Sequence, residues 1–118
     1  MTVPVVVLLC RVPLLCEALD GALAGVATVQ RFPASGDTGG LLRSLRPDSV
    51  VVDTAEEAAQ AEGYAQESGA PLVCVDLAQG ALSVFRSGRW EAPADATASS
   101  EGIRNVLVGG IFGRRRPA

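Results

Sequence analysis

The segment Pro47-Asp-Ser-Val-Val-Val-Asp-Thr54 contains the pattern that decides the fold. Its short apolar run is rich in β-branched residues, which predicts a strand over residues 49–53 that is buried on both faces. Thr54 comes next and is a favoured helix N-cap, with two glutamates in the first turn of a helix predicted over residues 55–67. A buried strand that leads directly into a capped helix is the repeating unit of α/β proteins.

The same alternation of strand and helix extends to both sides of this segment. Further strands are predicted over residues 3–9, 26–32 and 72–77. One helix is predicted from Pro13 to just before Gly25, and Asp37 or Thr38 is placed to cap a short helix over residues 41–45. Because strands and helices alternate and the strands are predicted to be buried, we expect a doubly wound, mainly parallel sheet with helices on both faces and the strand order 2-1-3-4-5.

Beyond the last of these strands the pattern changes. Strands predicted over residues 81–85 and 89–91 are joined by a connection too short for a parallel crossover, so we expect a C-terminal antiparallel β-hairpin. Ser99 or Ser100 is expected to cap a final helix over residues 101–112.

Length and charge limit the classes of protein and partner. The 118 residues suit one α/β domain, which we place at residues 1–113, followed by an Arg-rich tail at residues 114–118. The net charge of −3 does not favour binding to nucleic acid. The longest apolar run, residues 5–10, is far shorter than the roughly 20 residues that cross a bilayer. We therefore expect a cytoplasmic protein with no nucleic-acid or membrane partner.

The chain lacks several residue types on which catalysis depends. It contains no His and no Lys, which removes the commonest general base, Schiff-base chemistry and imidazole metal ligands. Its three cysteines, Cys10, Cys16 and Cys74, do not include a Cys-x-x-Cys pair, so we do not expect a zinc site. We expect buried, reduced thiols in a reducing compartment. We expect no enzyme activity, no cofactor and no metal.

Two segments resemble a known family. Leu45-Arg-Pro-Asp-Ser-Val-Val-Val-Asp53 is similar to the third-strand segment of response-regulator receiver domains, in which Pro-Asp leads into a hydrophobic strand that ends in the phospho-accepting Asp. Ser68-Gly-Ala-Pro-Leu-Val-Cys-Val75 resembles the lead into the receiver's fourth strand. The resemblance covers residues 1–77 and implies a flavodoxin-like fold with Asp53 at the phospho-acceptor position.

Other residues of the receiver site have no counterpart in this chain. The metal-binding acidic pair of the family would fall near Leu9, Cys10 and Arg11, and none of these is acidic. The hydroxyl residue that ends the fourth strand is replaced by Asp76, and the conserved Lys of the family cannot occur in a chain without Lys. Since phosphoryl transfer needs such charges, the resemblance implies a degenerate receiver that is not phosphorylated and acts in bacterial-type signalling or regulation by protein contact.

Several polar residues are expected at the carboxyl edge of the sheet. In the predicted strand order Arg11 lies beside Asp53, and the two could form a bidentate ion pair; alternatively, Asp53 and Thr54 only cap the following helix. Asp53 and Asp76 end neighbouring strands and form either a carboxylate pair or a solvated edge. A small-molecule or phosphate-binding protein that uses this edge is the alternative function.

The final helix is the candidate interaction surface. Its apolar stripe consists of Ile103, Val106, Leu107, Ile111 and Phe112. Gly109 and Gly110 weaken the helix, unless another backbone packs closely against them, as in a two-fold homodimer. The sequence leaves both a dimer and a monomer with a frayed helix open.

Overall fold

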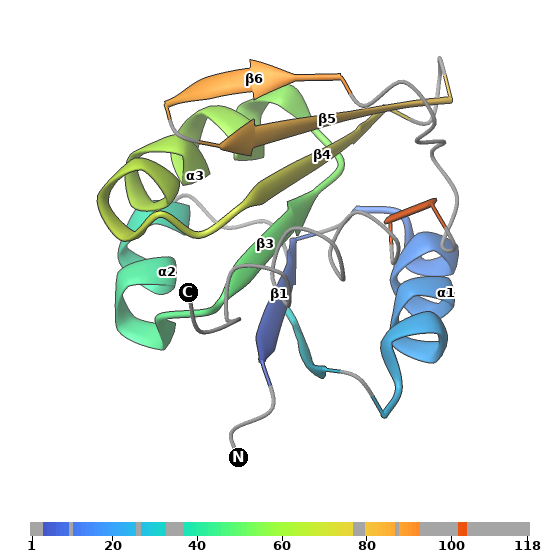
Figure 1. The fold of residues 1–118 in the computed structure, drawn as a ribbon. Helices are drawn as coiled ribbons and strands as arrows, with labels where there is room; N and C mark the ends of the chain where they lie inside the picture. Colours follow the sequence, from blue (N-terminus) through green and yellow to red (C-terminus); the bar gives the residue numbers. More distant parts are fainter. Residues whose placement is uncertain are drawn as a thin grey trace, which may run out of the picture.

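Strands and helices alternate along most of the chain (Figure 1). The computed structural model describes residues 4–9, 11–25, 27–32, 37–76, 80–86, 88–92 and 102–103. In chain order its elements are β1 (Val5–Leu9), α1 (Pro13–Leu23), β2 (Thr28–Arg31), α2 (Thr38–Leu45), β3 (Ser49–Val52), α3 (Ala55–Ser68), β4 (Leu72–Asp76), β5 (Ala81–Arg86) and β6 (Arg89–Glu91).

The strands form one mixed sheet in the order β2-β1-β3-β4-β5-β6. β1 is parallel to β2 and β3, and β3 is parallel to β4, whereas β5 is antiparallel to both β4 and β6. The α/β class and the hairpin are confirmed. The predicted order 2-1-3-4-5 must be corrected, because the second hairpin strand joins the same sheet: the two-residue connection between Arg86 and Arg89 allows only pairing beside β5.

Side chains alternate between two apolar layers, one on each face of the sheet. On one face, Val6, Leu8 and Val51 pack with α1. On the other face, Val7 and Val52 pack with α2 and α3. Figure 1 shows α1 on one side of the sheet and α2 and α3 on the other. Covering both faces explains why every residue of β3 is buried, and it confirms the prediction of helices on both sides.

Local sequence signals set the helix ends. The Thr54 side chain caps α3 by accepting a hydrogen bond from the Glu57 N–H at 3.2 Å, as predicted. The cap of α2 is Asp37, whose carboxylate accepts from the Gly40 N–H at 3.2 Å, so this helix begins three residues before the predicted start at residue 41. Arg46 ends α2 in the left-handed region, with φ 52°.

Part of the C-terminal prediction lies outside the described residues. Gly102 and Ile103 are helical, and Ile103 is fully buried in the apolar layer on the α1 side of the sheet. Ile103 therefore belongs to the core and is not available to a partner. The other predicted interface residues, Val106, Leu107, Ile111 and Phe112, lie outside the described residues, as does the tail. None of the helices in the described ranges is long and apolar enough to cross a membrane.

The backbone at Arg46 yields a prediction about stability. A left-handed conformation is costly for a residue with a Cβ and costs Gly little, so Arg46→Gly should raise the free energy of unfolding by about 0.5–1 kcal/mol. Urea unfolding measures the change. Arg46→Ala is the control, because Ala keeps the Cβ and should give no such gain. An Arg46→Gly variant no more stable than the wild type would contradict the interpretation.

Candidate functional site

The predicted site residues do meet at the carboxyl edge of the sheet. β1 and β3 are adjacent and parallel, with Leu9 opposite Val52, so the segments that follow them leave the sheet side by side. Arg11 and Val12 follow β1, and Asp53 and Thr54 follow β3.

The Asp53 carboxylate binds the backbone of the neighbouring segment. Its Oδ2 accepts hydrogen bonds from the N–H groups of Arg11, at 2.8 Å, and Val12, at 3.1 Å. Val12 is the N-cap of α1 and has no side-chain oxygen with which to cap it. Asp53 therefore places a carboxylate at the N-terminus of α1 from another strand, where the helix dipole favours negative charge.

The predicted ion pair between Arg11 and Asp53 is wrong. The guanidinium of Arg11 lies near Glu56 instead, with Nη2 at 3.7 Å from Oε2. The first turn of α3 carries Glu56 to this position, and Oδ2 of Asp53 already receives two N–H groups. Because the Arg11 and Glu56 side chains are 57% and 80% exposed, solvent screens their attraction and it adds little stability.

Two further atoms complete the surroundings of Asp53. The other carboxylate oxygen, Oδ1, is buried and has no hydrogen-bond partner in the described part of the chain. The Thr54 hydroxyl oxygen accepts the N–H of Glu57, so the capping interpretation of Thr54 holds. The edge is thus fixed by backbone and cap hydrogen bonds.

Asp76 lies farther along the edge, at the exposed end of β4. Burial raises the pKa of the half-buried Cys74 thiol, and the negative charges of Asp76 and Asp53 raise it further. Cys74 therefore stays protonated and is a poor nucleophile at neutral pH. Within the described ranges, no three acidic or sulfur side chains are arranged to hold a metal ion.

A buried polar contact joins the first turns of α2 and α3. Glu57 is 2% exposed, and the hydroxyl of Thr38, itself fully buried, donates to its Oε2 at 2.6 Å. Gln60 Oε1 accepts the N–H of Thr38 at 3.2 Å. Sequence reasoning took Glu57 for an ordinary first-turn acid, since no local pattern shows that Thr38, nineteen positions earlier, packs against it.

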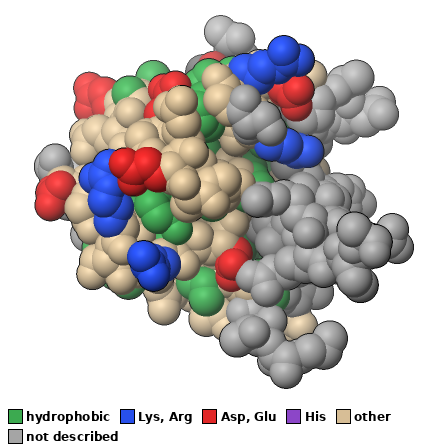
Figure 2. Space-filling view, turned by 60° about the vertical axis from the view of Figure 1, so that its left-hand side comes forward, with side chains coloured by type: hydrophobic (Ala, Val, Ile, Leu, Met, Phe, Trp, Pro, Cys, Tyr) green, Lys and Arg blue, Asp and Glu red, His purple; other side chains and the backbone are tan. Residues whose placement is uncertain are grey.

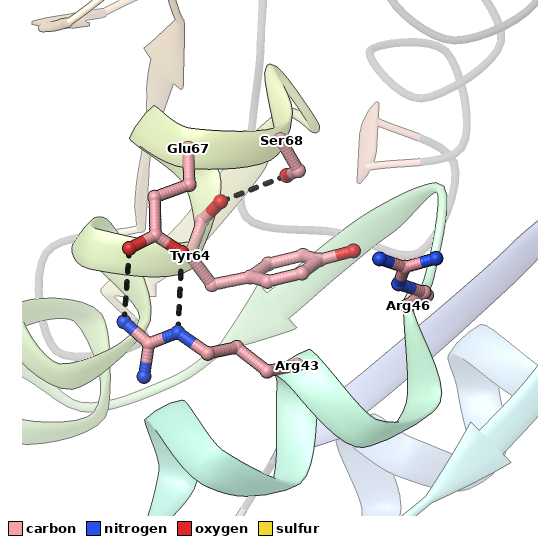
Figure 3. A pocket seen from close by; sticks show the side chains of 5 residues that line it. All are labelled: Arg43, Arg46, Tyr64, Glu67 and Ser68. Carbon is pink, nitrogen blue, oxygen red and sulfur yellow. Dashed lines mark hydrogen bonds and ion pairs between the residues drawn. The ribbon is translucent and has the colours of Figure 1, made fainter.

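A polar pocket of about 410 Å³ lies between the C-terminal ends of α2 and α3 (Figure 3). Its lining residues are Arg43, Arg46, Tyr64, Glu67 and Ser68. Arg43 donates from Nε and Nη2 to the carboxylate of Glu67, at 3.1 and 3.3 Å. These hydrogen bonds raise the pKa of Arg43 and lower that of Glu67.

The remaining groups of this pocket also have structural roles. Tyr64 Oη donates to the carbonyl oxygen of Pro47 at 2.9 Å, and burial raises the pKa of Tyr64. Figure 3 shows the Arg46 guanidinium beside the phenol oxygen of Tyr64. Cations are favourable at helix C-termini, so the presence of Arg43 and Arg46 at the end of α2 does not require a bound ligand to explain it. Sequence reasoning missed this pocket because its residues are far apart in the chain.

A second, apolar pocket of about 310 Å³ lies between α3 and the antiparallel strands. It is lined by Ala55, Ala58, Ala59, Glu62, Cys74, Ser83 and Trp90. Trp90 is 38% exposed and packs on Phe85, with ring centroids 5.3 Å apart.

Comparisons of the chain with models of protein families, with curated proteins and with solved structures give no match.

The geometry of Asp53 predicts which of two substitutions destabilises the protein. Asp53→Ala removes an acceptor for two backbone N–H groups and should lower the free energy of unfolding by about 1–3 kcal/mol. Arg11→Ala removes only an exposed side chain and should change it by less than about 0.5 kcal/mol. Urea unfolding of both variants measures the difference, and equal losses would show that the side chain of Arg11, and not its N–H, matters.

Proposed function

We propose that this chain is a non-catalytic, receiver-like interaction module of a bacterial-type signalling or regulatory system. The proposal includes the flavodoxin-like arrangement that the resemblance implies. The module is not phosphorylated, acts by contact with a protein partner, including a second copy of itself, and works in the cytoplasm, where its free thiols stay reduced.

The observation that carries the proposal is the bonding of Asp53. In a working receiver, the carboxylate at this position attacks a phosphoryl group beside a divalent cation and a lysine. Here one oxygen receives the N–H groups of Arg11 and Val12, and the other is buried. A nucleophilic oxygen must reach the phosphorus in line with the leaving group. An oxygen that is buried, or that already accepts two hydrogen bonds, is poorly placed to do so.

Charge supports the same conclusion. Phosphoryl transfer requires neutralisation of the negative charge that spreads over the transferring group. The positions at the end of β1 where the receiver family has acidic metal ligands hold Leu9, Cys10 and Arg11, and the chain contains no Lys. Arg11 follows β1 and is cationic, but its guanidinium lies near Glu56.

The alternative is a small-molecule or phosphate-binding protein that uses the carboxyl edge. One observation favours it: Oδ1 of Asp53 has no hydrogen-bond partner in the described part of the chain, and a ligand that reached this buried atom could supply one. The Arg11 guanidinium, which would recognise an anion, is turned to Glu56 and lies on the exposed surface. The interaction module is therefore the better supported function.

Incubation with acetyl phosphate and Mg²⁺ tests the proposal, with intact mass spectrometry as the readout. We expect no phosphorylated species, because Asp53 is sequestered and its counter-charges are missing. A stoichiometric phosphoryl adduct that disappears in Asp53→Asn but persists in Asp76→Asn would overturn the proposal and show that Asp53 is a phospho-acceptor.

A further inference from the structure

The outer edge of β6 is the edge at the antiparallel end of the sheet, and no described strand pairs with it. β6 is the last strand in the sheet order and pairs only with β5 among the described strands. All three of its residues are exposed. In Figure 1 it lies at the top of the molecule, and no other element is drawn beyond it. Such an edge offers unpaired backbone groups to another strand.

The register shows which backbone groups point outward. Arg86 and Arg89 flank the two-residue turn and form the hydrogen-bonded pair that closes a hairpin of this length. In an antiparallel ladder, hydrogen-bonded pairs alternate with pairs that are not hydrogen-bonded, so the next pair, Phe85 and Trp90, is not hydrogen-bonded. The N–H and C=O of Trp90 therefore both point away from β5.

The side chains of β6 place opposite charges around Trp90. Arg89 and Glu91 lie on the α1 side of the sheet, since they are opposite Arg86 and Val84 in the register, whereas Trp90 lies on the α3 side beside Phe85. Neither Arg89 nor Glu91 forms an ion pair within the described part of the chain. Arg89 also lies directly opposite Arg86, and like charges in this position are unfavourable.

We propose that β6 pairs antiparallel with β6 of a second copy, about a two-fold axis through Trp90. This inference rests on the proposed interaction function and names its surface. The two Trp90 residues then exchange N–H···O=C hydrogen bonds, as the outward direction of both groups allows. Arg89 lies opposite Glu91 of the second copy, and Glu91 opposite its Arg89, so both unpaired charges gain partners.

A second copy fits this edge because the sequence Arg89-Trp-Glu91 is complementary to itself when reversed. The added negative charge beside Arg89 also offsets its repulsion by Arg86. β6 is only three residues long, which keeps the pairing short. So short a contact buries little surface, and we expect a weak, concentration-dependent dimer.

Two other described regions were candidates for self-association. On the coloured part of the face shown in Figure 2, acidic and basic side chains are interspersed and hydrophobic side chains form only small separate areas. In the predicted final helix, Ile103 is buried in the core.

Charge reversal at the edge tests the proposal. Arg89→Glu and Glu91→Arg each place like charges opposite one another in the dimer, so each should weaken self-association about tenfold or more. The double variant Arg89→Glu/Glu91→Arg restores complementarity and should dimerise again. A mixture of the two single variants should form a heterodimer. Sedimentation velocity over a concentration series measures the mass, and the emission of Trp90, the only tryptophan, should shift to shorter wavelength as the dimer forms.

The controls distinguish a failure of the proposed β6 interface from a failure of the proposed function. Arg11→Glu reverses an exposed charge elsewhere and should leave self-association unchanged. A protein that is monomeric at all concentrations overturns the dimer. A dimer that persists in both single variants but is lost in Phe112→Asp overturns the β6 surface and places the contact on the final helix. Neither result bears on the proposal that the module is not phosphorylated, which the acetyl phosphate experiment tests.

Discussion

Oδ2 of Asp53 receives the backbone N–H groups of Arg11 and Val12, and these hydrogen bonds join the end of β3 to the turn between β1 and α1. The turn would otherwise present α1 with a Val N-cap that has no side-chain acceptor. α1 packs against one face of the sheet, and this contact fixes the start of the helix. The Thr54 cap fixes α3 on the opposite face, so adjacent residues anchor helices of both layers.

This use of Asp53 has a consequence for function. The Asp53 carboxylate holds a backbone turn, so it has a structural role at the polar edge that α/β proteins often use for ligands. Backbone groups that can bond to another strand lie at the β6 edge of the sheet, where the N–H and C=O of Trp90 point away from β5. The flanking Arg89 and Glu91 carry opposite charges and form no ion pair within the described ranges. Association by strand pairing suits such a surface.

The sequence predicts those features that depend on local patterns and misses those that depend on side-chain direction. The Thr54 cap and the burial of β3 follow from adjacent residues, and the adjacency of Arg11 and Asp53 follows from strand order. The atoms in contact do not: Asp53 binds the N–H of Arg11, while the guanidinium reaches Glu56. Likewise, the apolar pattern around Ile103 does not tell whether the core or a partner covers it, and the burial of Glu57 depends on a distant Thr38.

Amide hydrogen exchange at Arg11 and Val12 tests most directly whether Asp53 is a structural anchor. If its carboxylate holds these N–H groups, both amides exchange slowly in the wild type and much faster in Asp53→Ala, while the amides of β4 keep their protection. Fast exchange of both amides in the wild type, at the rate of an unstructured chain, would show that Asp53 is free and would contradict the account.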